Sequence, residues 1–597
     1  MRIRCTNFFL LLLCTSVAHA FTNSRSVFVP RSQDTNTARR LFIIDHDLDI
    51  EDTCYTFWAA PGFTRSFRSN KIACSLFGSS CLVFSGSKIE NRGSKDILAD
   101  YFGLPADFKS RVSFKPTITN FFIDCGWIIN LDWIHKGMKL QLLAPFVHTR
   151  WDLKLCEKVL QKGELFHPAG YMSGGNQRIE RNKLVKDVKT AFQGNCTFGD
   201  MQDPLEFGKI CGKQTETGIA QLRSQLYWIV TEDESYRLNA SVFVSAPTGN
   251  RPNAEYLFEP VVGAHHHWQL GIGLHGAWDI WSKKLPVENS QSDYRINKIE
   301  KVVDPMGDQC RLVFDLNLSH MFRCRQRRSF DFKNKPGSRY ALLMNMATPP
   351  RDDILRVPED VAPDNQYTGH LFPAINKTTL KADVSVALQA DLLFALSYTH
   401  NSWTFDIGYN FWGRTKEKIK CVEAFPSNKF ALKGDAQLYG FYSPGEEALS
   451  IAVPLNGTQS GGTVYSGQKD ANGNTNTDWS NKNVDNPAIA FEADTPGPLL
   501  QLTGKDFGDL AILFPGLSLE SVSGSDQAVL LTNNDIDVCS AASPRASTSK
   551  LFATCSYTLD KRERWDPYVG WGLELEFAHS CRALSQFGAW IRFGASY

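Results

Sequence analysis

The stretch Trp268-Gln-Leu-Gly-Ile-Gly-Leu-His-Gly-Ala-Trp-Asp-Ile280 alternates strictly between large apolar side chains and small or polar ones. Successive side chains of a β-strand point to opposite faces, whereas a helix repeats every 3.6 residues, so the pattern predicts a strand. The run is longer than an ordinary strand of about five or six residues. Trp278 lies ten positions after Trp268. At about 3.3 Å per residue and a strand tilt near 40°, the two tryptophans are roughly 25 Å apart along the membrane normal. This length is typical of a strand that crosses a lipid bilayer.

The same alternation recurs along the chain in pairs of runs joined by short polar turns. Residues 384–398 and 403–411 each carry one apolar and one polar face, with only His400-Asn401-Ser402 as the turn between them. This arrangement predicts a hairpin with an apolar exterior. Similar pairs of runs flank the turns at 135–137 and 231–235. The expected strands cover residues 53–67, 117–133, 138–155, 220–230, 238–246, 268–280, 312–324, 384–398, 403–411, 430–442, 449–455, 551–559, 569–577 and 587–597.

In hydrocarbon an unpaired backbone amide costs several kcal/mol, so spanning strands must close into a ring. The sequence therefore predicts an all-β fold, a transmembrane antiparallel up-and-down β-barrel of about 14 strands, with 12 to 16 as the range. Short turns fall on one side of this barrel, at 135–137, 231–235, 399–402, 443–447 and 560–567. The external loops on the other side cover about 68–110, 156–216, 247–266, 325–383 and 456–548, and a long segment at 282–309 is the exception on the short side.

Two features precede or interrupt the expected strands. In residues 1–20, Arg2 and Arg4 come before the apolar run 8–13, and Ala18-His19-Ala20 closes it, which predicts a cleaved secretory signal. We expect residues 21–52 to form an N-terminal periplasmic segment and residues 53–597 to form the barrel with its loop insertions. A short helix is expected near 94–103, with Ser94 as N-cap and Gly103 as C-cap.

Composition and cysteine content narrow the class of protein. A net charge of +1 and 21% charged residues provide no field for nucleic acid, and 12% aromatic residues argue against a disordered chain. Thirteen of the fifteen cysteines follow the expected signal, and export permits disulfides. We expect disulfides within the external loops, such as Cys74 with Cys81, although sequence does not assign connectivity. Cross-links to other envelope proteins are the alternative.

The polar faces of the expected strands should line the interior of the barrel, and aromatic side chains should form girdles at its two rims. The expected lumen residues are Gln269, His275, Asp279, Gln389, Asp391, Asp406, Asn410, Arg223, Gln225, Glu574, Glu576, Trp590 and Arg592. The expected girdle residues are Trp268, Trp278, Tyr398, Trp403, Trp571 and Tyr597. Because the inward charges are of both signs, we expect no strong selectivity for anions or cations.

The last expected strand carries a further signal. Gln586, Gly588, Ile591 and Phe593 fit the order polar-x-Gly-x-x-apolar-x-aromatic, and Tyr597 ends the chain in the same register. At this point the chain resembles the bacterial outer-membrane β-barrel proteins, whose final strand carries such an assembly signal, although four residues follow Phe593 here. The resemblance implies location in the bacterial outer membrane, with outer-membrane lipid and the barrel-assembly machinery as partners.

Other motifs have competing interpretations. His265-His266-His267 invites a metal site, but only alternate side chains of a strand share a face, so an interfacial polar cluster is the stronger interpretation. The oxygen-rich run 470–481 lacks the Gly and the final carboxylate of a calcium loop, which favours a flexible loop. Arg323, Arg325, Arg327 and Arg328 form a basic cluster that would suit lipopolysaccharide head groups or a partner, with solvated surface charge as the alternative.

Catalytic signatures are missing from the sequence. It contains no GxSxG elbow, HExxH motif, P-loop or GxGxxG after a strand. We therefore expect no enzyme, no metal and no cofactor. The function predicted is a porin-like channel for small polar solutes, with a barrel-anchored surface structural or adhesion protein as the alternative. A secreted soluble all-β binding protein is the second alternative, and the oligomeric state stays open.

Overall fold

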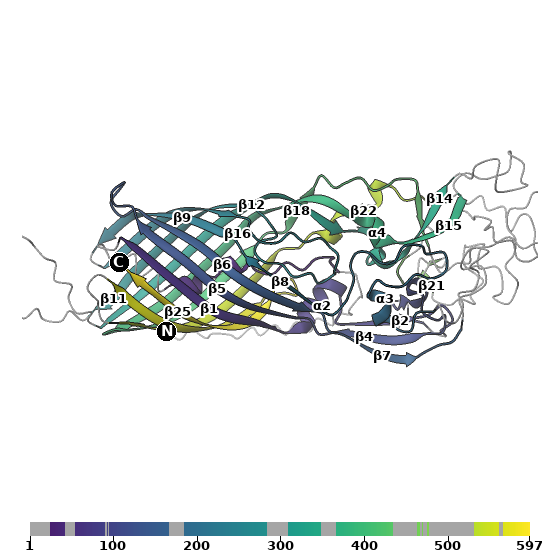
Figure 1. Cartoon of the computed structure of the whole chain (residues 1–597), viewed down its shortest axis with the longest axis horizontal. Coiled ribbons are helices and arrows are strands. Elements are labelled where there is room, and N and C mark those ends of the chain that lie inside the picture. The colour runs from purple at the N-terminus through teal and green to yellow at the C-terminus, as the bar shows by residue number, and fades with distance from the viewer. Residues whose placement is uncertain are drawn as a thin grey trace, which may run out of the picture.

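The computed structural model describes residues 24–41, 54–89, 92–93, 95–165, 184–233, 235–282, 308–347, 366–433, 463–465, 468–469, 475–476, 530–559 and 565–597. Twelve antiparallel strands close into a barrel, in which β12 pairs with β16 and the last strand, β25, pairs with β1 (Figure 1). The twelve are β1 (Tyr55–Phe67), β5 (Thr117–Asn130), β6 (Lys139–Asp152), β9 (Leu222–Asp233), β10 (Tyr236–Ala246), β11 (Gln269–Ser282), β12 (Gln309–Ser329), β16 (Thr379–His400), β17 (Trp403–Arg414), β23 (Ala546–Thr558), β24 (Asp566–Ala578) and β25 (Ser585–Ser596).

The alternating pattern produces the expected two faces. Along β11 the exposed residues Leu270, Ile272 and Leu274 point outward, and the buried residues Gln269 and His275 point inward. The same alternation is present on β24, where outward Leu573 alternates with inward Glu574. The prediction of an all-β, closed antiparallel barrel is therefore confirmed.

The number of barrel strands is twelve, at the low end of the expected range. Residues 430–442 were expected to form a barrel strand, but in the described part of this run, 430–433, the strand β19 (Phe430–Leu432) pairs with β14 outside the barrel. That prediction was wrong because a short apolar run looks alike in a barrel and in a packed core. The expected strand at 449–455 lies outside the described residues. Two further strands extend the barrel wall without entering the ring, β8 (Lys213–Ile219) beside β6 and β18 (Glu417–Lys420) beside β16.

The long connections gather at one end of the barrel and form a cap with small sheets of its own (Figure 1). One sheet has the order β3-β2-β4-β7, and another has the order β15-β14-β19. The cap strands are β2 (Cys81–Ser85), β3 (Ile97–Leu98), β4 (Lys109–Phe114), β7 (Leu155–Gln161), β13 (Asp331–Phe332), β14 (Leu342–Ala347), β15 (Gln366–Pro373), β20 (Gln468–Lys469), β21 (Thr475–Asn476) and β22 (Ile536–Asp537). The helices are α2 (Ser69–Phe77), α3 (Val188–Phe192) and α4 (Ala374–Thr378), with 3-10 turns at Gln33–Thr35, Ala99–Phe102, Ser338–Tyr340, Asn533–Asp535 and Val538–Ala541.

The cap has a continuous apolar core. Phe77 of α2 stacks on Phe114 of β4 with ring centroids 3.9 Å apart, and both belong to a cluster that reaches Leu343 of β14. The helix expected near 94–103 is shorter than predicted. Only the 3-10 turn Ala99–Phe102 forms, and it ends at Gly103, whose φ of 70° is the left-handed C-cap conformation.

On both the inner and the outer face of the barrel wall, large rings lie over glycines of neighbouring strands. A Cβ placed on Gly572 of β24 would stand 2.3 Å from the Trp590 ring, and one on Gly276 would stand 2.0 Å from the ring of Phe314. No other residue leaves room for such a ring, so these glycines are required by close approach rather than by backbone conformation.

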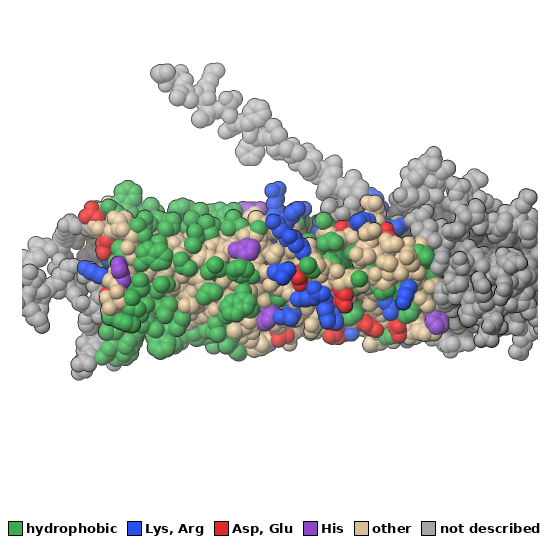
Figure 2. All heavy atoms as spheres, turned by 90° about the horizontal axis from the view of Figure 1, so that it is seen from above, with side chains coloured by type: hydrophobic (Ala, Val, Ile, Leu, Met, Phe, Trp, Pro, Cys, Tyr) green, Lys and Arg blue, Asp and Glu red, His purple; other side chains and the backbone are tan. Residues whose placement is uncertain are grey.

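The exterior of the barrel is apolar around one end of the molecule and mixed beyond it, as Figure 2 shows on the face in view. Ile272, Ile407 and Leu573 each have about 60% of their surface exposed, at 59, 65 and 61%. A soluble sandwich would bury such faces against each other, whereas here they point away from the protein.

Candidate functional site: a plugged lumen

Residues 24–41 run from the cap into the interior of the barrel. At the cap, Arg25 N donates to Ser75 O at 3.0 Å, and Phe28 packs on Trp151 of the barrel wall. Residues 37–41 form a short helical turn that is buried in the lumen. Residues 21–52 were expected to form a periplasmic segment, and residues 24–41 of this range lie against the cap and inside the barrel. Their many small and polar side chains suggest an exposed linker, and the ion-pair partners of Arg31 and Arg39 on the wall lie more than 80 residues away in sequence. We call residues 24–41 the plug.

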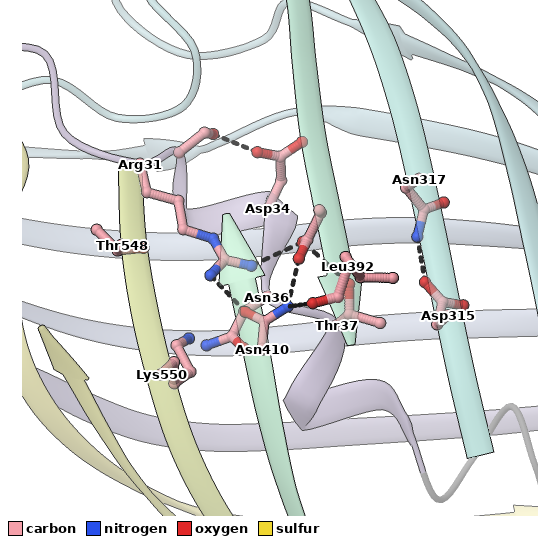
Figure 3. A network of polar contacts seen from close by, with 12 residues as sticks. Arg31, Asp34, Asn36, Thr37, Asp315, Asn317, Leu392, Asn410, Thr548 and Lys550 are labelled. Atoms are coloured by element: carbon pink, nitrogen blue, oxygen red, sulfur yellow. Dashed lines mark hydrogen bonds and ion pairs between the residues drawn. The ribbon is translucent and has the colours of Figure 1, made fainter. Parts of the chain in front are cut away.

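Arg31 is the main polar anchor of the plug (Figure 3). Its Nη2 lies 2.7 Å from Asp391 Oδ2, and its Nη1 donates to Asn410 Oδ1 at 2.7 Å. Nη1 also lies 3.6 Å from Glu576 Oε1. Thr37 Oγ1 donates to the same Asp391 oxygen at 3.1 Å. The plug is therefore held to β16, β17 and β24 by charge-assisted hydrogen bonds, which are stronger than neutral ones.

Further polar contacts lie deeper in the lumen. Arg39 Nη1 is 2.7 Å from Asp124 Oδ2, and its guanidinium lies 3.7 Å from the centroid of the Phe122 ring. Asn36 Nδ2 donates to Glu574 Oε2 at 2.8 Å, and Lys550 Nζ lies 2.9 Å from the same oxygen. The plug thus contacts strands in different parts of the ring, β5 and β24.

The lumen carries charges of both signs on its wall and an excess of cations on the plug. Among the described residues, the twelve barrel strands carry six buried inward carboxylates and six buried inward cations. The carboxylates are Asp124, Asp315, Asp391, Asp406, Glu574 and Glu576, and the cations are Lys139, Arg223, Arg328, Arg414, Lys550 and Arg592. The plug brings three buried arginines, Arg31, Arg39 and Arg40, against one carboxylate, Asp34. The cationic plug therefore finds its carboxylate partners within a wall whose buried charges balance.

One layer of the lumen is apolar. Ala38 and Leu41 of the plug are buried in a cluster with Trp58, Phe122 and Trp590 of the wall. The space that remains beside the plug is a narrow cavity lined by residues of both parts, including Arg31, Asn36, Asn120 and Lys550. The plug therefore narrows the lumen at this level to that cavity.

The structure places the predicted lumen residues as follows. Buried and inward-facing are Gln269, His275, Gln389, Asp391, Asp406, Asn410, Arg223, Gln225, Glu574, Glu576, Trp590 and Arg592. Asp279 lies near the end of β11, partly exposed, with its Oδ1 2.6 Å from Arg311 Nε. Asp391, Asn410, Glu574 and Glu576 meet at the plug, whereas Arg223 and Gln225 contact Asn317 on β12.

Sequence reasoning did not find the plug arginines or two charged wall residues beside the plug, Asp124 and Lys550. Asp124 and Lys550 both stand on the inward face of a strand, so alternation alone was sufficient to select them. Arg31 and Arg39 belong to no alternating run, and the only available signal was three arginines within ten residues before the first strand.

The predicted girdle residues are on the outer surface. Trp278, Tyr398, Trp403 and Trp571 are exposed near the short turns, and Tyr597 stacks on Tyr55 with centroids 4.8 Å apart. Trp268 is exposed at the opposite end of β11. Of the predicted assembly-signal residues on β25, Ile591 and Phe593 point outward, Gly588 is buried, and Gln586 donates to Glu576 Oε2 at 2.8 Å.

The fold points members of two predicted clusters, the histidines at 265–267 and the arginines at 323–328, in different directions. His265 and His266 have positive φ and so do not continue the strand, while His265 and His267 are both buried. Burial lowers the pKa of His265, which keeps its imidazole neutral. Of the four arginines at 323–328, Arg323 and Arg325 point outward, whereas Arg328 is buried and lies 3.3 Å from Glu417. The oxygen-rich run 470–481 lies almost wholly outside the described residues.

Two further features are absent from the described residues. The part of the chain that the structure describes contains no group of three or more His, Cys, Asp or Glu that could hold a metal ion. It also contains no helix that is both long and apolar enough to cross a membrane.

Thirteen cysteines are described, all as free thiols. Cys74 and Cys81, the pair suggested by the sequence, are both free thiols. The Cys74 sulfur lies 3.7 Å from Gly78 O, and Cys74 shares a hydrogen bond with Cys581, in the connection between β24 and β25. This hydrogen bond, together with Lys71 and Arg582, lowers the pKa of Cys581 to about 6.

Comparison with known proteins adds little beyond the architecture. No family model and no curated protein matches the chain. Similar solved structures include the transport unit of the autotransporter AIDA-I from Escherichia coli, with TM-score 0.29, 6% identity, and coverage of 92% of this chain and 91% of that one. For the toluene transporter TodX from Pseudomonas putida the TM-score is 0.29 and the identity 8%, with coverage of 96% of this chain and 96% of that one. For the translocator domain of autotransporter NalP from Neisseria meningitidis the TM-score is 0.25 and the identity 6%, with coverage of 94% of this chain and 95% of that one. Scores this low indicate neither a shared family nor a shared solute.

Proposed function

We propose that the chain is an outer-membrane β-barrel channel for small polar solutes, held closed by its own N-terminal plug. The exposed apolar band of about 25 Å, estimated from the ten-residue spacing of Trp268 and Trp278, suits a bilayer rather than water. A cleaved signal at 1–20 and the assembly signal on β25 would bring the chain to that membrane.

The observation that carries the channel function is the way the plug is attached. It is bound to the wall mainly by ion pairs and hydrogen bonds, such as Arg31 with Asp391 at 2.7 Å and Arg39 with Asp124 at 2.7 Å. Both partners of each pair are polar groups that water solvates well. When the plug leaves, water replaces its contacts, so the wall tolerates an open state that an apolar core would not.

The second candidate is a barrel that only anchors the cap at the surface. The large continuous core of the cap and the filled lumen favour it. In that case the plug would be a permanent part of the core, and the polar lumen would never conduct.

Conductance in planar bilayers distinguishes the two functions. The full chain and a variant that lacks residues 24–41 but keeps the signal are purified from membranes and compared. The channel function predicts rare openings of the full chain and steady discrete steps from the variant. A sealed variant that still shows the heat-dependent gel migration of a closed barrel would support the anchor instead.

A further inference from the structure

Six cations point outward from three neighbouring strands at the border between barrel and cap. We call them the basic patch: Arg323, Arg325, Arg327, Lys381, Lys418 and Lys420. The strands are β12, β16 and β18, and the register places Arg325 beside Asp383, which stands beside Lys420, while Arg327 stands beside Lys381. Figure 2 shows Lys and Arg side chains gathered where Figure 1 places β18.

The basic patch begins where the apolar band ends. Phe322 and Leu388 are exposed, at 43 and 45%, and Phe322 N donates to the backbone oxygen of Trp268 at 2.8 Å. The very next residue, Arg323, has 67% of its side chain exposed. Tryptophan marks the interface of a bilayer, and Trp268 lies beside Phe322. Arg323, Arg325 and Arg327 follow Phe322 along β12 by one, three and five residues, so they would stand at the level of the lipid head groups.

Local carboxylates do not neutralise the basic patch. Asp383 Oδ2 lies 3.5 Å from Arg323 Nε, and its Oδ1 lies 3.3 Å from Arg325 Nη1, so one carboxylate is shared by two arginines. Among the described residues on the outer face of these three strands and in the segment 421–425 after β18, Glu423 is the other acid, and its Oε2 accepts from the backbone N of Lys381 at 3.1 Å. Glu417 points inward to Arg328 and is buried. Six cations thus face two acids.

The dimensions of the basic patch indicate what it would bind. Two strand spacings separate β12 from β18, about 10 Å, and Arg323 to Arg327 spans roughly 13 Å. One phosphate covers only part of such an area. Arginine pairs with phosphate through two parallel hydrogen bonds. A lipid head group with more than one phosphate would meet cations on all three strands.

We propose that the basic patch binds the phosphate groups of a multiply phosphorylated glycolipid in the leaflet next to the cap. This inference rests on the proposed membrane location. If the cap faces outward, that leaflet is the outer one, and the lipid is of the lipid A class.

The test is native mass spectrometry of the full protein in detergent, titrated with bisphosphoryl lipid A and with the same lipid after removal of its phosphates. The triple variant R323Q/R325Q/K420Q is compared with K158Q/K162Q/K186Q, which removes three exposed lysines from the cap. We expect at least a tenfold loss of affinity in the first variant and no change in the second. Binding to the wild type should also weaken as salt is raised.

Three outcomes would overturn the proposal: equal binding of the dephosphorylated lipid, unchanged binding by the patch variant, or an equal loss in the cap variant. Heat-dependent gel migration confirms that each variant is folded. Channel function is read separately in the bilayer assay, so lipid binding by a protein that never conducts would support the basic patch and contradict only the channel.

Discussion

Replacing Arg31 with methionine should release the plug without changing the barrel wall. The substitution keeps an unbranched side chain as far as the position of Nε and removes the charged guanidinium group. Lost with the charge are the contact to Asp391 at 2.7 Å, the hydrogen bond to Asn410 at 2.7 Å and the longer contact to Glu576 at 3.6 Å. The substituted residue belongs to the plug, so strand pairing should be unaffected.

The magnitude follows from the burial of these groups. Removing one partner of a buried ion pair costs about 3–5 kcal/mol when the other charge stays buried. Here Asp391 keeps a hydrogen bond from Thr37, and water enters the lumen when the plug leaves. We therefore expect the substitution to lower the free energy of plug release by about 2–3 kcal/mol. That energy corresponds to roughly a 30- to 150-fold increase in the ratio of open to closed channels.

Single-channel recording measures this ratio directly. Arg237→Met is the matched control, because Arg237 pairs with the partly exposed Glu232 near a short turn, where an ion pair contributes about 0–1 kcal/mol. A double variant with Asp391→Asn should show less than the sum of the two single effects. The reasoning is refuted if Arg31→Met stays as closed as the wild type while the variant without residues 24–41 conducts.

Three further predictions concern the barrel, the thiols and the lumen. Gly572→Val should lower the temperature at which the barrel unfolds on a gel, by an amount equivalent to about 1–3 kcal/mol, because the added atoms meet Trp590 at 2.3 Å; Gly413→Ala, whose Cβ meets Phe411 at 3.4 Å, is the control and should change little. In reduced protein, iodoacetamide should label Cys581 faster than the exposed Cys211 at pH 7, because a thiol with a pKa of about 6 is mostly thiolate above that pH; Cys74→Ser should slow the labelling of Cys581, and equal rates in both proteins would contradict the role of the hydrogen bond. The open lumen of the variant without residues 24–41 should select weakly between cations and anions, because six inward carboxylates then face six inward cations; a reversal potential close to that of an ideally cation- or anion-selective pore in a potassium chloride gradient would contradict this.

The alternation of side chains was sufficient to predict the barrel and most of its lumen. Period two is a local property of an extended backbone, so inward Glu574 and outward Leu573 were readable without any knowledge of their neighbours. All twelve barrel strands fall on runs selected from the sequence. The barrel strand expected at 430–442 arose from a run that carries no information about whether it faces lipid or a packed cap.

Sequence by itself determined which side chains face the lumen, because pleating fixes that choice residue by residue. Only the tertiary structure decided what fills the lumen. Arg31 meets Asp391 across 360 positions of the chain, and Arg39 meets Asp124 across 85. No local pattern links partners so distant, since their contact depends on closure of the ring and on the path of the plug through it. The same closure brings β12, β16 and β18 side by side and so assembles the basic patch from three separate runs.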